Sequence, residues 1–138
     1  MEKDVKLKIF VSGKFEDREK IKELMKQIEG LGHTITYDWT YHIPIKPYIN
    51  NQALAQTYCK NEIKGIMDAD LLFFLSHEQG TTLMMEYGAA LAKNLIDGKP
   101  AIYVIGKHNS RSPWFFHPNV KRIDDVEQAL KEIAELTK

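Results

Sequence analysis

The chain has 138 residues, which is the size of one domain and leaves little room for a second. An apolar fraction of 43% and a charged fraction of 28% are typical of soluble globular proteins and exclude a disordered or fibrous chain. Nineteen Lys and Arg residues balance nineteen Asp and Glu residues, so the formal net charge is zero. Because binding to a nucleic-acid polymer needs an excess of cationic side chains, we expect no such partner. The net charge does not exclude a small-molecule ligand.

Cysteine usage and apolar run lengths indicate the compartment. The single cysteine, Cys59, excludes an internal disulfide and is typical of a reducing environment. The N-terminal Met-Glu-Lys-Asp is charged and no apolar signal-peptide core follows it. The longest apolar runs, at residues 71–75 and 101–105, are far shorter than the roughly 20 residues that span a bilayer. These features predict a cytoplasmic protein with no membrane partner.

In the first half of the chain, short β-branched or aromatic runs alternate with segments of helical period. Residues 7–11 and 34–37 are expected to be strands, and residues 38–50, with two prolines, a loop. The first helix is expected between the two strands, to end at Gly30 or Gly32 and to bury Ile21, Leu24, Met25 and Ile28. A second helix is expected from Gln52 to Met67, with one face made of Ala55, Cys59, Ile63 and Ile66.

The second half of the chain continues the alternation. The uninterrupted apolar run at residues 71–75 is typical of a central strand buried on both faces, and further strands are expected at 101–105 and 120–123. Thr81 or Thr82 is placed to cap a third helix, whose buried face is expected to comprise Met84, Tyr87, Leu91 and Leu95. The last helix is marked by Val126, Ala129, Leu130 and Ile133.

This order of elements predicts an α/β fold. Strands separated by helices pair in parallel through right-handed crossovers, and five of them fit a flavodoxin-like (Rossmann-like) doubly wound sheet in the order 2-1-3-4-5. In that order the switch point lies between strands one and three, and ligands bind beyond the carboxyl ends of strands there. The sequence therefore predicts that a ligand binds at the loops formed by residues 12–15 and 76–82.

The two loops exclude several common uses of such a sheet. With Gly13 as its only glycine, the first loop is neither a dinucleotide-binding G-x-G-x-x-G turn nor a P-loop. Ser76 stands where a phospho-acceptor domain needs an aspartate, and no G-x-S-x-G hydrolase elbow is present. The five histidines show no H-x-E or H-E-x-x-H spacing, so neither a metal site nor a cofactor is expected.

Glu86 remains as the candidate for chemistry. It is expected in the first turns of the helix that follows the buried strand, behind the switch-point crevice. The helix dipole there favours an ionised carboxylate, which suits a nucleophile. An acidic residue early in a helix is also a common stabilising feature, worth about a few tenths of a kcal/mol, so position alone leaves both interpretations open.

Three segments form an ordered set along the chain. The first is Ile-Phe-Val-Ser-Gly at residues 9–13, followed by Phe15, Asp17 and Arg18. The second is Asn-Glu-Ile-Lys-Gly-Ile at 61–66 with Asp-Ala-Asp at 68–70, and the third is Glu-Tyr-Gly-Ala-Ala-Leu at 86–91 with Gly-Lys-Pro at 98–100. Together they resemble the nucleoside 2-deoxyribosyltransferases and the related deoxynucleotide N-hydrolases.

The resemblance implies a single nucleoside 2-deoxyribosyltransferase-like domain over residues 1–138. Glu86 matches the family's nucleophilic glutamate, which attacks C1′ of the sugar, expels the base and forms a glycosyl ester that a second base or water resolves with retention. Glu62 matches an aspartate that handles the base, and Phe10 stands at a tyrosine position beside the nucleophile.

The loop before Glu86 is the segment in which the transferases and the hydrolases of this family differ. Gly80 stands where the transferases have an aspartate and the hydrolases a small polar residue that serves a 5′-phosphate. The N–H groups of residues 80–82 are expected to form an anion site, with Lys14 and Arg18 as cations, although a plain helix cap with solvated charges is an equal alternative. The sequence leaves open deoxyribosyl transfer, hydrolysis of a nucleoside 5′-monophosphate, and a non-catalytic nucleotide-binding module.

Asp38 and Trp39 follow the second strand at the same edge of the sheet. Trp39 is a candidate for stacking on a base, an interaction worth about 1–3 kcal/mol, or else closes the end of the core. Tyr37, Tyr41 and His42 share this ambiguity.

The segment at residues 112–119 is apolar for a loop, which is typical of an interface or of core packing. In the family, a neighbouring subunit completes the site from this region, which implies a homodimer or larger assembly, with Asn109 or Ser112 reaching the sugar 5′ position. The expected residues that bind a nucleoside or nucleotide are Phe10, Ser12, Gly13, Asp38, Trp39, Glu62, Gly80, Thr81, Thr82, Asn109 and Ser112.

Overall fold

The computed structural model of the chain describes residues 5–136, and five parallel strands form one sheet within them. The order is β2-β1-β3-β4-β5, which confirms the flavodoxin-like arrangement predicted from the sequence. The bounds of the strands are β1 (Lys8–Ser12), β2 (Thr34–Ile35), β3 (Leu71–Leu75), β4 (Ala101–Ile105) and β5 (Val120–Ile123).

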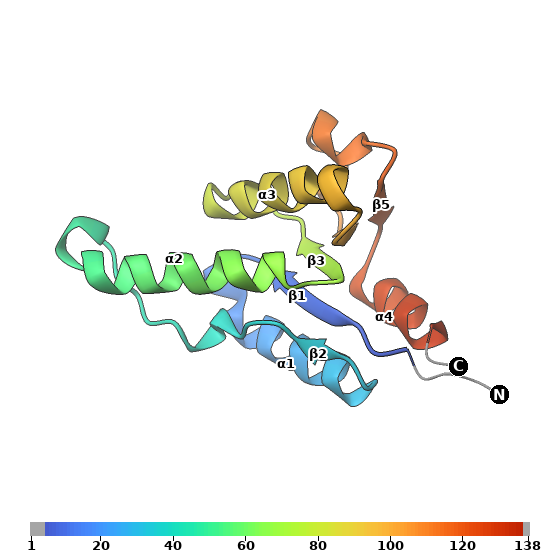
Figure 1. The fold of residues 1–138 in the computed structure, drawn as a ribbon, viewed down its shortest axis with the longest axis horizontal. Helices are drawn as coiled ribbons and strands as arrows, with labels where there is room; N and C mark the ends of the chain where they lie inside the picture. The colour runs from blue at the N-terminus through green and yellow to red at the C-terminus, as the bar shows by residue number, and fades with distance from the viewer. Residues whose placement is uncertain (1–4, 137–138) are drawn as a thin grey trace.

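Four α-helices within the described residues cover the sheet: α1 (Arg18–Gly30), α2 (Gln52–Met67), α3 (Thr82–Asp97) and α4 (Val126–Glu135). Helices α2 and α3 lie over one face, and α1 and α4 over the other (Figure 1). The first half of α2 and the turn before it extend beyond the sheet (Figure 1). Because both connections to β3 run on the α2–α3 face, side chains of these two helices can meet above the switch point.

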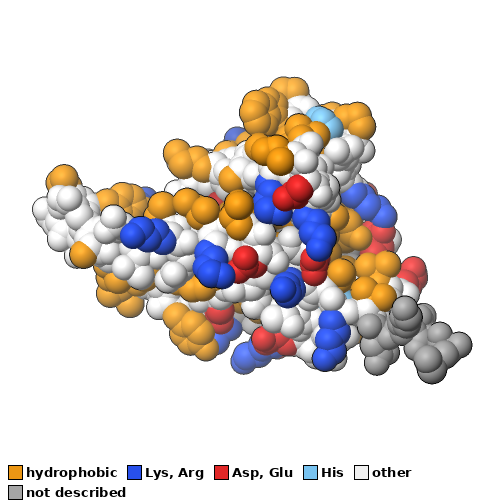
Figure 2. All heavy atoms as spheres, in the orientation of Figure 1, with side chains coloured by type: hydrophobic (Ala, Val, Ile, Leu, Met, Phe, Trp, Pro, Cys, Tyr) orange, Lys and Arg blue, Asp and Glu red, His pale blue; other side chains and the backbone are white. Residues whose placement is uncertain are grey.

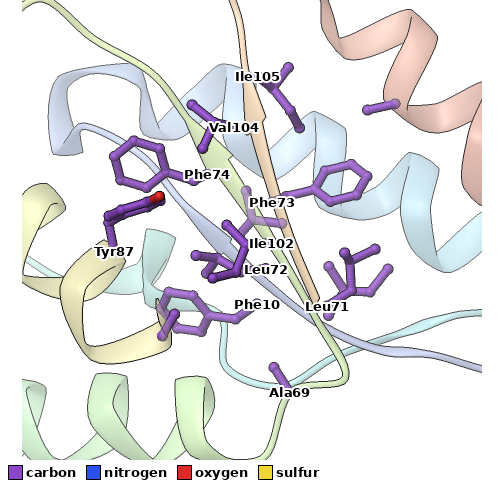
Figure 3. Packing of buried hydrophobic residues seen from close by; sticks show 14 of the residues in the cluster. Phe10, Ala69, Leu71, Leu72, Phe73, Phe74, Tyr87, Ile102, Val104 and Ile105 are labelled. Atoms are coloured by element: carbon purple, nitrogen blue, oxygen red, sulfur yellow. The ribbon is translucent and has the colours of Figure 1, made fainter. Parts of the chain in front are cut away.

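Strand β3 is the centre of the core, as its apolar run predicts. Leu72 and Phe74 point toward α3 while Leu71 and Phe73 point to the opposite face (Figure 3). All four are buried, with Phe74 packing edge-on against Tyr87 of α3 at a centroid distance of 5.2 Å. A strand buried on both faces fixes the positions of the loops at its carboxyl end.

The second strand is shorter than predicted, with residues 34 and 35 in place of 34–37. Thr36 still donates its N–H to the Ile9 carbonyl, after which the chain leaves the sheet. The Asp38 carboxylate accepts from the N–H and hydroxyl of Thr40, and this turns the backbone into a short 3-10 helix at Trp39–Tyr41. An Asx-type turn therefore ends the strand early.

Two predicted helix faces are wrong in part. On α2, Ile66 is buried, but Cys59 and Ile63 are exposed, and Gly65 packs against the sheet instead. On α3, Leu95 is 57% exposed. The buried residues of α3 are Leu83, Tyr87, Ala90, Leu91 and Asn94. Thr81 occupies the N-cap position of α3, but its side chain makes no capping hydrogen bond.

None of the helices in the described range, 5–136, has the length and apolar character needed to cross a membrane.

The close approach of α2 to the sheet depends on Gly65. A Cβ at this position would lie 2.9 Å from Cδ1 of the buried Phe10 ring and 2.9 Å from Cβ of Tyr37. We expect Gly65→Ala to lower the free energy of unfolding by about 1–3 kcal/mol, because neither neighbour is a flexible chain end. Chemical denaturation measures the loss. Gly30→Ala, with nothing within 4 Å of the added methyl group, is the control and should be neutral or slightly stabilising; equal stability of the two variants would contradict the packing argument.

Candidate active site

The site begins where β1 ends beside α3. Ser12, the last residue of β1, is fully buried, and its hydroxyl donates to Oε1 of Glu86 at 2.5 Å. Glu86 lies on the second turn of α3, half-buried and directed toward the sheet. The predicted nucleophile therefore faces the switch point between β1 and β3, and its carboxyl group is held by the strand itself.

Glu62 of α2 approaches the same point. The carboxyl groups of Glu62 and Glu86 hydrogen-bond to each other, which requires a proton between them. The pKa of Glu86 is raised to about 9, mainly by burial and in addition by the contact with Glu62, while the Ser12 hydroxyl opposes the shift. Burial also raises the pKa of Glu62, but its hydrogen bond with Glu86 lowers it. The pKa values of both carboxyls are raised, so the pair retains a proton near neutral pH, and the larger shift makes Glu86 its expected site. The ionised Glu86 expected from the helix dipole is therefore not favoured in the empty site, because burial outweighs the dipole.

Glu62 also lies against His42, whose ring contacts two tyrosines. Nδ1 of His42 lies 3.4 Å from Oε2 of Glu62, and its Nε2 lies 2.6 Å from the hydroxyl of Tyr37. The ring of Tyr58 stacks on the His42 ring with a centroid distance of 3.5 Å and an interplanar angle of 2°. A continuous row of polar groups thus runs from Tyr37 through both carboxyls to Ser12.

A second group of polar side chains lies at the β3–α3 loop. Nη1 of Arg111 donates to the His77 carbonyl at 2.8 Å, and His77 Nε2 lies 3.4 Å from Glu16. The Lys14 side chain lies against Gly80, since a Cβ on that glycine would be 3.4 Å from Lys14 Cδ. Loops that follow β1, β3 and β4 are therefore joined at this end of the sheet, with two cations among them.

The two predicted loop glycines have steric roles. A Cβ on Gly13 would lie 2.5 Å from Cδ1 of Ile21, so glycine lets α1 pack close to the end of β1. Gly80 has φ +135°, a conformation that favours glycine, and it leads into Thr81 and Thr82 at the exposed start of α3. Unlike the predicted cation Arg18, whose guanidinium lies 4.4 Å from the Phe15 ring centroid, Lys14 is turned toward this loop.

Phe10 and Trp39 do not face a ligand. Phe10 is fully buried under Gly65, and Trp39 is 5% exposed with its Nε1 donating to the Val11 carbonyl at 2.7 Å. Both side chains fill the core behind the site. Their prediction as substrate-contacting residues is corrected to a structural role, because strand alternation directs Phe10 inward and the indole closes the end of the sheet.

Asp38, Asn109 and Ser112 also have structural partners. Asp38 holds the turn at residues 39–41, as described above, and the Ser112 hydroxyl accepts from the Trp114 N–H at 3.2 Å. Asn109 is 7% exposed and donates to the Ile123 carbonyl at 3.0 Å. None of the three touches Glu86 or Glu62 within the chain, so the structure does not bring them into the site.

Two residues of this region, Tyr58 and Arg111, were not predicted from the sequence. Tyr58 precedes Glu62 by four positions, a spacing that puts both on one face of a helix and could have placed Tyr58 beside Glu62. No local pattern marks Arg111, because its contact with His77 joins loops that are distant in sequence. Among residues 5–136, no three His, Cys, Asp or Glu side chains gather in a way that could hold a metal ion.

The proton on Glu86 links the site to stability. Its pKa of about 9 in the fold exceeds the ordinary value of 4.5, so the folded state retains a proton that the unfolded state releases, and stability falls as pH rises from about 5 to 9. Glu86→Gln keeps the shape without the ionisation. We expect it to stabilise the protein by on the order of 1–2 kcal/mol at pH 8 and much less at pH 5.

Thermal unfolding across this pH range checks the expectation, with Glu23→Gln on the exposed side of α1 as the control. A Glu86→Gln variant that is no more stable than the wild type at pH 8 would contradict the assignment of the proton to Glu86.

Comparison with known proteins finds similarity to solved structures. Neither a scan against protein-family models nor a search of curated proteins finds a match. Among solved structures, the CMP N-glycosidase BcmB of Clostridium botulinum superposes with a TM-score of 0.57, over 94% of this chain and 98% of that chain. The two sequences are 19% identical. The chain therefore shares the fold of that enzyme.

Proposed function

We propose that the protein is an N-glycosidase of the nucleoside 2-deoxyribosyltransferase family, which cleaves the bond between base and sugar in a nucleoside 5′-monophosphate with Glu86 as nucleophile. The observation that carries the proposal is the buried carboxyl pair of Glu86 and Glu62 at the switch point. Two carboxyls that hold one proton supply both groups that glycosidic cleavage needs, a nucleophile and an acid. The fold shared with a CMP N-glycosidase supports the same class of substrate.

The single proton of the pair accounts for the first step. When substrate binds, the proton passes from Glu86 to Glu62, which leaves Glu86 ionised. An oxygen of Glu86 then bonds to C1′ while the bond from C1′ to the base nitrogen breaks. The electron pair of that bond stays with the base, which takes the proton from Glu62. Ser12, hydrogen-bonded to Glu86, keeps the nucleophilic carboxylate in place.

The second step restores the enzyme. Glu62, now a carboxylate, accepts a proton from a water molecule whose oxygen bonds to C1′. The ester bond between C1′ and Glu86 breaks at the same time, and the sugar is released with its configuration retained after two inversions. One proton is again shared by Glu86 and Glu62, as in the empty site.

Hydrolysis of a nucleotide is favoured over transfer between nucleosides by the charge near the site. Lys14 lies against Gly80, and Arg111 is held to the same loop through the His77 carbonyl. Both cations stand close to the start of α3, where free N–H groups and the helix dipole attract an anion. A 5′-phosphate fits this position, whereas an uncharged 5′-hydroxyl gains nothing from two cations.

The activity is tested by incubation with ribo- and deoxyribonucleosides and their 5′-monophosphates, with and without an acceptor base, followed by chromatography of the free base. We expect base release from monophosphates without acceptor, and a loss of at least 10³-fold in Glu86→Gln, whose folding is checked by the thermal-unfolding measurement described above. Exchange only with acceptor would indicate a transferase instead. Binding without turnover would indicate a nucleotide-binding module and would contradict the proposal.

We also propose that the protein works as a homodimer through the outward side of α3. Several large apolar residues of this helix lie outside its buried face, which is unusual for a helix exposed to solvent on one side. On its solvent side Met85 is 66%, Leu95 57% and Ile96 84% exposed. A groove of about 450 Å³ separates α3 from the turn at Pro113–Phe116, where Trp114 is 60% exposed. Hydrophobic side chains gather over this part of the surface and along α2 (Figure 2).

A second copy is the partner that this surface suits. A two-fold contact places the same apolar patch on both sides and needs no complementary charge, which suits a groove lined mainly by apolar side chains. The patch continues onto α2, where Ile63 and Met67 are 52% and 54% exposed. Because Glu86 lies next to Met85 on α3, a partner on this face would also border the site.

Light scattering coupled to gel filtration tests the dimer. We expect twice the chain mass for the wild type and for Leu136→Lys, a control on the opposite side of the sheet at the end of α4. Ile96→Lys and Met85→Lys should yield monomers, because each would bury a lysine charge in the interface. A monomeric wild type would contradict this proposal.

A further inference from the structure

The rings around Glu62 form a cluster that the proposed reaction does not yet use. Tyr37 and His42 belong to the connection between β2 and α2, and Tyr58 belongs to α2 itself. The His42 side chain is 9% exposed and the Glu62 side chain 20%. None of these rings contacts Glu86, so their effect on Glu86 must pass through Glu62.

Two contacts fix the orientation of the His42 ring. Tyr58 stacks on one side of it and accepts the N–H of Ile43 at 3.0 Å through its own hydroxyl, so the backbone next to His42 is held by the same residue. The Tyr37 hydroxyl lies 2.6 Å from Nε2. Because Tyr58 covers one face of the His42 ring and Tyr37 holds Nε2, the ring presents Nδ1 to Glu62.

The charge state of His42 follows from its surroundings. Burial lowers the pKa of His42, and the Asp38 carboxylate opposes this shift only in part, so the ring is neutral at pH 7. A neutral ring whose Nε2 accepts the Tyr37 O–H carries its proton on Nδ1. Nδ1 is the ring nitrogen that lies 3.4 Å from Oε2 of Glu62, so its proton lies on the side of the carboxylate.

From this geometry we infer that His42 is a positioning residue of the proposed glycosidase: held by Tyr37 and Tyr58, it orients the Glu62 carboxyl toward Glu86 and favours the charged form of Glu62. The inference rests on the proposed function for its role in catalysis. The orientation of the carboxyl pair itself is a property of the empty site.

The inference accounts for the order of proton affinities at the site. Nδ1 of His42 lies 3.4 Å from Oε2 of Glu62, so an N–H there faces the Glu62 carboxylate, whereas the Glu86 carboxyl has the Ser12 hydroxyl as its neighbour from the sheet. The titratable groups that face this row are Asp38, Tyr37 and Tyr58, in addition to the histidine and the two glutamates. Among Asp38, Tyr37, Tyr58 and His42, the side chain that lies 3.4 Å from the Glu62 carboxyl is that of His42.

The test compares His42→Phe, which retains a ring against Tyr58 but removes the N–H, with His42→Gln, which retains a donor. Tyr41→Phe is the control, because Tyr41 lies on the same turn but is 71% exposed. Two readouts are needed: the pH dependence of kcat and kcat/KM, and the titration of ¹³C-labelled glutamate carboxyls in the free protein by NMR. Glu62→Gln and Glu86→Gln assign the two signals.

We expect His42→Phe to lower kcat at least tenfold with KM changed by less than about threefold, since Glu62 is misoriented but the substrate contacts are kept. Loss of the N–H disfavours the charged form of Glu62, so the acid limb of kcat/KM should move up by about one pH unit. The NMR midpoint of Glu62 should rise in parallel. His42→Gln should recover part of both effects, and Tyr41→Phe should match the wild type.

Unchanged carboxyl midpoints and an unchanged acid limb in His42→Phe would overturn the inference. If the wild type releases no base from any nucleotide, the proposed function fails and the NMR titration decides alone: shifted midpoints support the positioning role, and identical midpoints reject it. Should His42→Phe fail to fold by circular dichroism, Tyr37→Phe and His42→Gln provide the same comparison, because Tyr37→Phe removes the partner that fixes the proton on Nδ1.

Discussion

The contact between the carboxyl groups of Glu62 and Glu86 is the interaction on which the candidate site depends. Two carboxylates cannot both ionise when they are buried against each other, so the pair must hold a proton at neutral pH. This arrangement reduces stability, and nothing in the packing of the sheet requires it. A destabilising charge pair at the switch point of an α/β sheet is typical of a site kept for its chemistry.

The fold brings the pair together through backbone geometry. Glu62 and Glu86 lie on helices that cover the same face of the sheet, one on each side of the β1–β3 boundary (Figure 1). Gly65, about one turn after Glu62, lets α2 pack closely against Phe10. Ser12, at the end of β1, donates a hydrogen bond to the Glu86 carboxyl. The chemistry of the site thus rests on a close helix-to-sheet contact that only glycine permits.

The buried faces predicted from hydrophobic periodicity are wrong in part for α2 and α3, the two helices that carry the candidate site. The pattern on α2 placed Cys59 and Ile63 inward, yet the inward positions belong to Glu62, Tyr58 and Gly65. A helix that lines a polar site turns polar side chains toward the protein and leaves apolar ones outside. The same mismatch on α3, with Leu95 and Ile96 exposed, is what the proposed dimer would explain. Deviations of this kind are expected at functional surfaces.

The sequence by itself determined the architecture, because strand runs and helical periods depend on neighbours a few residues apart, and it determined that Glu86 follows the buried strand at the switch point. It also identified Glu62 and Ser12, through their resemblance to a family motif. Only the tertiary structure decided that Glu86 and Glu62 share a proton, that His42 stands behind Glu62, and that Phe10 and Trp39 are core. Those outcomes depend on distances between segments far apart in the chain, and on the burial that results, which no local pattern encodes.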